Sequence, residues 1–143
     1  MVSFNDIGAC LQNCFSGYYH EIKIKDDQVG KRVNLRANFN KGAFKCNFAV
    51  FVNVFQSLAA VYTIYFDLIN DTYYSKKLIQ EFNSSSNFFK AENMDGRLGF
   101  SICYQAKDLN NLSSFVSTAI EEMRKLEKNQ TALNLVSITS KVV

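Results

Sequence analysis

The sequence predicts an α+β fold in which an antiparallel sheet of about five strands combines with three helices, in the order helix, three strands, helix, two strands, helix. Three observations lead to this prediction. The uncharged run 46–66 alternates with period two, an Asp-Gly pair separates two further alternating runs, and apolar residues recur at helical spacing after Asp108. Period-two alternation is typical of strands, and spacings of three and four residues are typical of helices.

The run 46–66 (CNFAVFVNVFQSLAAVYTIYF) is long enough to cross a bilayer as a helix. It contains polar amides, and residues such as Asn47, Asn53 and Gln56 are costly in hydrocarbon. Apolar and aromatic residues alternate on both sides of a short break at Gln56-Ser57. We therefore predict two antiparallel strands joined by a tight turn, with both faces of the sheet covered and no membrane span.

The chain before this hairpin is expected to begin with a helix near 3–17. An acidic residue follows Ser3 after three positions, as in a capping box, and apolar residues then recur every three or four positions. The segment HEIKIK at 20–25 alternates and leads into the polar turn DDQVGK, and 33–39 alternates again. Up to the end of the 46–66 hairpin, the predicted order contains one helix and three strands, and the first connection between the strands is the longest.

The chain after the hairpin is expected to form a helix near 72–84, because Asn70-Asp71-Thr72 supplies capping side chains. The pair Asp95-Gly96 lies between FFKAENM and RLGFSICYQ, which predicts a hairpin with a two-residue turn of positive φ. The residues of this hairpin expected to face the core are Leu98, Phe100, Ile102 and Tyr104.

Asp108 is expected to cap a final amphipathic helix of about 20 residues that lies on the sheet. Its apolar stripe consists of Leu109, Leu112, Val116, Ala119, Met123 and Leu126. Residues 1–129 are predicted to form a single domain. Residues 130–143 are predicted to be a C-terminal tail that is flexible, adds an edge strand or is donated to a partner.

Composition favours an ordinary folded chain. Of the 143 residues, 48% are hydrophobic and 20% are charged, which disfavours intrinsic disorder. The net charge is +3, and the segment 20–45 alone contributes +4, from seven basic and three acidic residues. The basic residues of this segment, called here the basic patch, are Lys23, Lys25, Lys31, Arg32, Arg36, Lys41 and Lys45. The patch suits contact with a phosphate backbone, and it equally suits protection of an exposed strand edge against aggregation.

The N-terminus has no basic start followed by an apolar core, so no secretory signal is predicted and a cytoplasmic location is expected. The four cysteines are then expected to be free thiols. Cys10, Cys14 and His20 suggest a metal or a nucleophile, but a zinc site needs three or four ligands in recognisable pairs and no CxxC is present. We therefore expect no metal, no cofactor and no catalytic residue.

The stretch SKKLIQEFNSSSNFFKAENMDGRLGFSICYQAKDLNNLSSFVSTAIEEMRKLEK (75–128), together with the predicted order of elements, resembles the YbjN-like and type III secretion chaperone-like α+β domains. The similarity covers about two-thirds of the chain at the level of element order, and its motifs are of low specificity. The resemblance implies a homodimer with a central sheet and apolar patches that bind an extended segment of another protein. Secretion chaperones of this kind are typically acidic, whereas this chain is mildly basic.

The sequence therefore predicts a non-enzymatic, protein-binding adaptor or chaperone-like module, active as a homodimer. Aromatic residues on both faces of the 46–66 hairpin motivate this prediction, because such residues dominate interface energetics. The residues expected to face a partner are Phe51, Phe55, Tyr62, Tyr65, Leu78, Ile79 and Phe82. The alternative is a small inhibitor of phage or mobile-element type that binds a nucleic-acid-handling complex through the basic patch.

Overall fold

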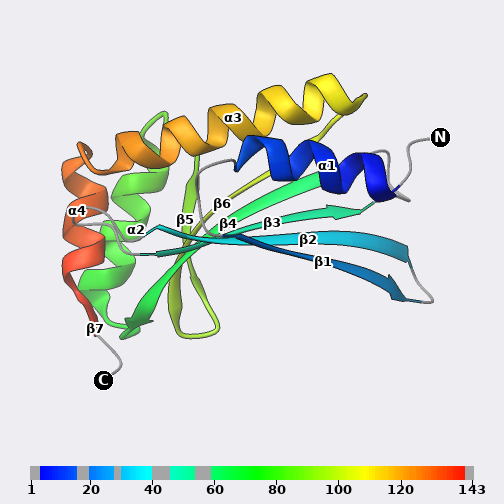
Figure 1. Ribbon diagram of the computed structural model, residues 1–143. Helices are drawn as coiled ribbons and strands as arrows, with labels where there is room; N and C mark the ends of the chain where they lie inside the picture. Colours follow the sequence, from blue (N-terminus) through cyan, green and yellow to red (C-terminus); the bar gives the residue numbers. More distant parts are fainter. Residues whose placement is uncertain (1–3, 16–19, 28–29, 40–45, 54–58, 141–143) are drawn as a thin grey trace.

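The computed structural model describes residues 4–15, 20–27, 30–39, 46–53 and 59–140 (Figure 1). The chain forms an α+β fold. Its elements are α1 (Phe4–Cys14), β1 (His20–Asp27), β2 (Gly30–Phe39), β3 (Cys46–Asn53), β4 (Ala59–Ile69), α2 (Tyr73–Ser84), β5 (Lys90–Met94), β6 (Arg97–Gln105), α3 (Leu109–Leu126), α4 (Gln130–Ser137) and β7 (Thr139–Ser140).

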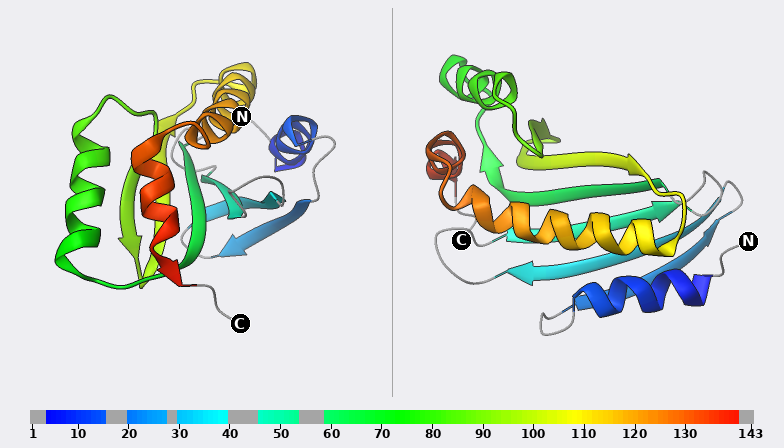
Figure 2. Two further views of the ribbon diagram at one scale, coloured as in Figure 1. Left: turned by 90° about the vertical axis from the view of Figure 1, so that its left-hand side faces the viewer. Right: turned by 90° about the horizontal axis from the view of Figure 1, so that it is seen from above.

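The strands form one antiparallel sheet in the order β1-β2-β3-β4-β6-β5, and β7 pairs with the end of β4. Figures 1 and 2 show α1 and α3 lying over the sheet, with α2 and α4 packed against its end at β4, β5 and β6. The strands are long and carry alternating β-branched and aromatic residues, the composition that suits a pleated, half-buried surface.

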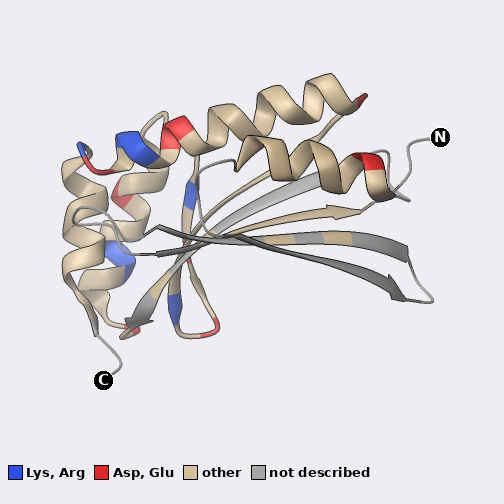
Figure 3. Ribbon diagram, in the orientation of Figure 1, with Lys and Arg blue, Asp and Glu red and all other residues tan. Residues whose placement is uncertain are grey.

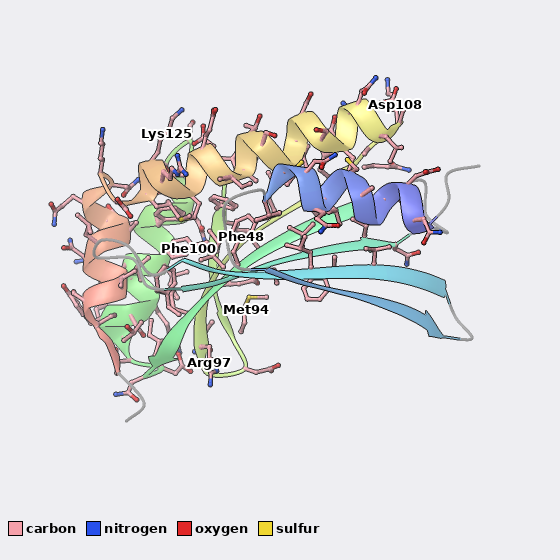
Figure 4. The ribbon with its side chains drawn as sticks, in the orientation of Figure 1. Phe48, Met94, Arg97, Phe100, Asp108 and Lys125 are labelled. Atoms are coloured by element: carbon pink, nitrogen blue, oxygen red, sulfur yellow. The ribbon has the colours of Figure 1, made fainter. Side chains whose placement is uncertain are left out.

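One row of residues across the sheet shows that the helices share a single face. Phe48, Ile64 and Phe100 stand opposite one another on β3, β4 and β6, and directly opposed residues point to the same face. The ring of Phe48 lies 5.5 Å from that of Phe15, just after α1, and the ring of Phe100 lies 5.1 Å from that of Phe82 on α2. All three row residues are fully buried. Figure 4 shows Phe48 and Phe100 on the same side of the sheet as the helices.

The opposite face of the sheet carries none of the described helices. Met94 lies on that side in Figure 4, away from Phe48 and Phe100. In the described part of the chain, helices therefore cover one face only, whereas on the other face Ala49 is buried and Phe51 is half-buried by neighbouring residues. Period-two alternation with apolar residues in both sets does not by itself reveal which set the helices cover.

The two predicted hairpins are confirmed. Residues 47–53 pair with 59–65, although the predicted turn at Gln56-Ser57 lies outside the described residues. Asp95 and Gly96 have φ values of 52° and 87°, the left-handed conformations that a two-residue hairpin turn needs. The predicted helices near 3–17, 72–84 and after Asp108 correspond to α1, α2 and α3.

The predicted element count is wrong in two places. Four strands, not three, precede α2, because 20–27 and 30–39 form separate strands, with 20–27 paired to 30–37. The segment 130–143 is not a simple tail, because 130–137 forms α4. Asn129 caps this helix by accepting a bond from the Ala132 amide, and Ala132 and Leu135 are fully buried. The pairing of β7 with β4 corresponds to one of the predicted alternatives, an added strand.

Candidate functional site

A groove opens at one edge of the sheet, between the end of α2 and the second half of β6. We call it the edge groove; its volume is about 450 Å³. It is lined by Asn83, Ser85, Asn87, Phe88, Phe89, Lys90, Ser101, Ile102 and Cys103. The groove exists because β5 has five residues whereas β6 has nine, and their last pair is Lys90 with Ser101.

The outer edge of β5 is closed by a side chain. The Asn83 amide donates to the carbonyl oxygen of Ala91 at 2.8 Å and accepts from the Ala91 amide at 2.7 Å. Asn83 thus makes the pair of bonds that a neighbouring strand would make. The main-chain groups of Ala91 therefore point away from β6, and those of Lys90 and Ser101 point toward each other, because this direction alternates along an antiparallel strand.

The same alternation gives the direction of the main chain further along β6. Two residues beyond Ser101, the amide and carbonyl groups of Cys103 point to the side on which β5 lies. β5 begins only at Lys90, opposite Ser101, so it does not reach as far as Cys103. Phe88, which precedes β5, does not belong to a strand and its ring packs 5.9 Å from that of Phe115. The edge of β6 at Cys103 is thus oriented to receive an additional strand.

Burial changes along β6 at the same point. Leu98 and Phe100, beside β5, are fully buried, whereas Ile102 and Tyr104 are half-buried. The half-buried Phe88 adds a further apolar surface to this end of the sheet. The prediction that all four β6 residues face the core is confirmed for Leu98 and Phe100, and the other two lie at the border of the core.

The edge groove has little charge. Lys90, at the start of β5, is exposed and is the one charged residue of the lining (Figure 3). Ser101 donates to Glu92 Oε1 at 2.9 Å, so the nearest described carboxylate on β5 already has a partner. The arrangement combines main-chain hydrogen-bonding groups, an apolar floor and one cation, which suits a polypeptide segment better than a small polar substrate.

The structure divides the predicted partner-facing aromatic residues between the two faces of the sheet. Phe51 is half-buried, and its register places it on the face without helices, opposite Val61. Tyr65 occupies a register position on that same face, whereas Tyr62, opposite Val50, occupies one on the helix-covered face. Phe55 lies outside the described residues.

Two predicted partner-facing residues of α2 are corrected. Leu78 is 5% exposed and Phe82 is fully buried, so both belong to the core of the chain itself. The apolar spacing along α2 indicates one buried stripe, and this stripe packs on the sheet. Ile79 is half-buried at the border of the core.

The basic patch is also divided by the sheet. Lys23 and Lys25 on β1, and Arg32 and Arg36 on β2, occupy register positions on the face that contains Phe51. Lys31, opposite Asp26, occupies a position on the helix-covered face. Lys41 and Lys45 lie outside the described residues.

Cys10 and Cys14 on α1 form hydrogen bonds to main-chain groups of α3. Cys10 Sγ donates to the Leu109 carbonyl at 3.6 Å, and Cys14 Sγ donates to the Ser113 carbonyl at 3.8 Å. Burial raises the pKa of the Cys10 thiol, and the neighbouring Cys14 raises it further. Within the described residues, no group of three or more His, Cys, Asp and Glu side chains could hold a metal ion.

The sequence analysis did not identify Asn83, Lys90 or the half-buried end of β6 as a site. One pattern in the sequence does point to it: FFKAENM is shorter than RLGFSICYQ, so the longer strand of this hairpin must extend beyond the shorter one. None of the helices in the described ranges is sufficiently long and apolar to span a membrane. A comparison with protein-family models, curated proteins and solved structures finds no match to the chain.

Proposed function

We propose that this chain is a non-enzymatic protein-binding module, an adaptor or chaperone-like protein, that receives an extended segment of another protein in the edge groove. The observation that carries the proposal is the orientation of the Cys103 main chain toward the side where β5 has ended. A segment placed there continues the line of β5 and forms main-chain bonds with β6, the mode of recognition known as strand addition.

The groove also specifies the side chains of the segment. Residues of an added strand alternate between the two faces. On the helix-covered side an apolar residue meets Phe88 and Ile102, which are half-buried. On the other side an acidic residue meets Lys90, which is exposed. The expected segment therefore alternates apolar and acidic residues.

A second copy of the chain does not offer a free β5 edge to this groove. The edge of β5 is closed by Asn83, so it cannot serve as the added strand without losing two hydrogen bonds. The homodimer that the resemblance implies would use another surface, and sedimentation at micromolar concentration tests it. A reducing, cytoplasmic setting agrees with the proposal, and Cys10, Cys14 and Cys103 are free thiols.

The test is affinity capture of the tagged chain from its own host, after nuclease treatment, with two variants at one position. Cys103→Pro removes the outward-pointing amide, and proline is tolerated where an edge amide faces solvent. Cys103→Ser keeps that amide and serves as the matched control. We expect a single stoichiometric protein with the wild type and the Ser variant, and loss of that protein with the Pro variant.

The captured protein is then mapped to the segment that binds, and a peptide of that segment is titrated. Retention of the partner by a folded Cys103→Pro variant would contradict strand addition. A mapped segment without alternating apolar and acidic residues would contradict the specificity. Recovery of the chain alone would contradict the adaptor function.

A further inference from the structure

The sheet face opposite the helices forms a second surface, separate in most of its area from the edge groove. We call it the open face. One row of register positions crosses it from β1 to β6: Lys23, Asn34, Phe51, Val61 and Cys103. The two described side chains at the centre and end of this row are not fully covered, since Phe51 is half-buried and Cys103 is exposed.

The open face is asymmetric in charge. The four cations at positions 23, 25, 32 and 36 lie on β1 and β2, with two carboxylates, Glu21 and Asp27, on the same face. The net charge of β1 and β2 on this face is therefore +2, from four cations and two carboxylates. The face positions of β3 and β4 carry no charged residue between 47 and 65. Two copies placed with β1 and β2 opposite their own equivalents would oppose like charges, which disfavours that arrangement.

Amide residues surround Phe51 on this face. Asn34 is its direct neighbour on β2, Asn53 is two residues along β3, and Arg32 and Arg36 occupy the two diagonal positions on β2. Diagonal neighbours on adjacent strands are about 7–8 Å apart. These positions hold the residue types of single-strand recognition: an aromatic residue for stacking, an amide for base edges and cations for phosphates.

From this placement we propose that the open face binds single-stranded nucleic acid, with one base stacked on Phe51 and the backbone crossing β2 and β1. An acidic protein segment would pair with the cations but would offer no base to stack on the ring of Phe51. The proposal does not depend on the edge groove, because no residue on β1, β2 or β3 lines that groove.

The chain offers a clean reporter, because it contains no tryptophan. Phe51→Trp introduces a single indole at the proposed stacking position and is titrated with an oligothymidylate of about 12 nucleotides, within the range of single-strand site sizes. We expect quenching of the indole fluorescence that saturates. An abasic oligomer of equal charge should bind more weakly and should not quench.

Two further variants test the two parts of the surface. By anisotropy of the labelled oligomer, Phe51→Leu, which keeps an apolar residue, should bind between about 5-fold and 150-fold more weakly. Arg32→Gln/Arg36→Gln should make the slope of log affinity against log salt shallower by about 1.4, since each phosphate contact on a single strand contributes about 0.7. The matched control is Lys77→Gln/Lys128→Gln, which removes two exposed cations from the helical side of the chain.

Several outcomes would overturn the proposal. No binding to the oligomer at low salt would do so, as would equal losses in the two double variants, because attraction would then depend on net charge alone. Equal affinity for duplex DNA would exclude single-strand recognition. Tighter binding of polyglutamate in competition with the oligomer would assign the face to an acidic protein. Circular dichroism and the melting temperature of each variant establish that it is folded.

Discussion

The two halves of β6 differ in what lies beside them, and they differ in burial for the same reason. The first half, with Leu98 and Phe100, pairs with β5, which is in turn closed by Asn83, and these side chains are fully buried. The second half, with Ile102 and Tyr104, extends beyond β5 and is half-buried. One strand thus supplies both a closed part of the core and an incompletely covered edge.

The largest expected effect distinguishes these halves by stability. Phe100 lies in edge-to-face contact with Phe66 and Phe82, with ring centroids 5.6 Å and 5.1 Å away. We expect Phe100→Ala to lower the free energy of unfolding by about 3–5 kcal/mol, because it removes these contacts and leaves a cavity. Ile102→Ala should cost only about 1 kcal/mol, because its side chain is already partly in water. Urea denaturation of both variants measures the contrast, and equal costs would contradict it.

A second prediction concerns the approach of β5 to the first half of β6. A Cβ atom at Gly99 would overlap Met94 Sδ and lie 2.9 Å from Met94 Cγ. We expect Gly99→Ala to destabilise the chain by about 1–2 kcal/mol, the lower part of the range for overpacking, because the half-buried Met94 side chain is flexible and can shift. Shortening the neighbour should relieve the overlap, so Gly99→Ala/Met94→Ala should be more stable than the sum of the single variants predicts. Strict additivity in urea denaturation would show that the two side chains do not meet.

The sequence predicted the parts of this comparison that depend on local patterns. The hairpin at Asp95-Gly96 followed from turn chemistry, and the burial of Leu98 and Phe100 followed from alternation. Neither pattern contains information on where a neighbouring strand ends, so the half-buried state of Ile102 and Tyr104 was not predicted. In the same way, apolar spacing identified Leu78 and Phe82 as one stripe, and only the packing of α2 on the sheet showed that the stripe is buried.

The open face shows the same limit of sequence analysis. Alternation within β1 and within β2 groups Lys23 with Lys25 and Arg32 with Arg36, but the register between the strands decides whether the two pairs share a face. A shift of one residue would have placed the pairs on opposite faces. The coincidence of these positions with that of Phe51 is therefore a result of the structure rather than of the sequence pattern.

A third prediction opens the closed edge. Asn83→Ala removes both hydrogen bonds to the main chain of Ala91, which is a buried residue. We expect the free energy of unfolding to fall by about 1–2 kcal/mol, because the amide and carbonyl groups of Ala91 lose these bonds. The variant should also show faster amide hydrogen exchange at Ala91. Asn83→Asp keeps the acceptor but loses the donor, so its exchange rate should lie between those of the wild type and Asn83→Ala. Unchanged exchange at Ala91 would show that Asn83 does not close this edge.

The smallest expected effect lies away from β6, at the contact between α1 and α3. Burial, with a further contribution from Cys14, raises the pKa of Cys10 above its ordinary value of 9.0. A raised pKa in the folded state means that folding retains a proton which the unfolded chain releases first. The contribution of the Cys10 thiol to stability is therefore fully present below pH 9.0 and is lost as the pH rises through the higher folded-state pKa. Urea denaturation at a series of pH values above 9.0 should show the free energy of unfolding falling with pH, less steeply in Cys10→Ala than in the wild type. An identical fall in both proteins would contradict a raised pKa at Cys10. Because Cys10 is half-buried, the loss of stability with pH should be small beside the loss caused by Phe100→Ala.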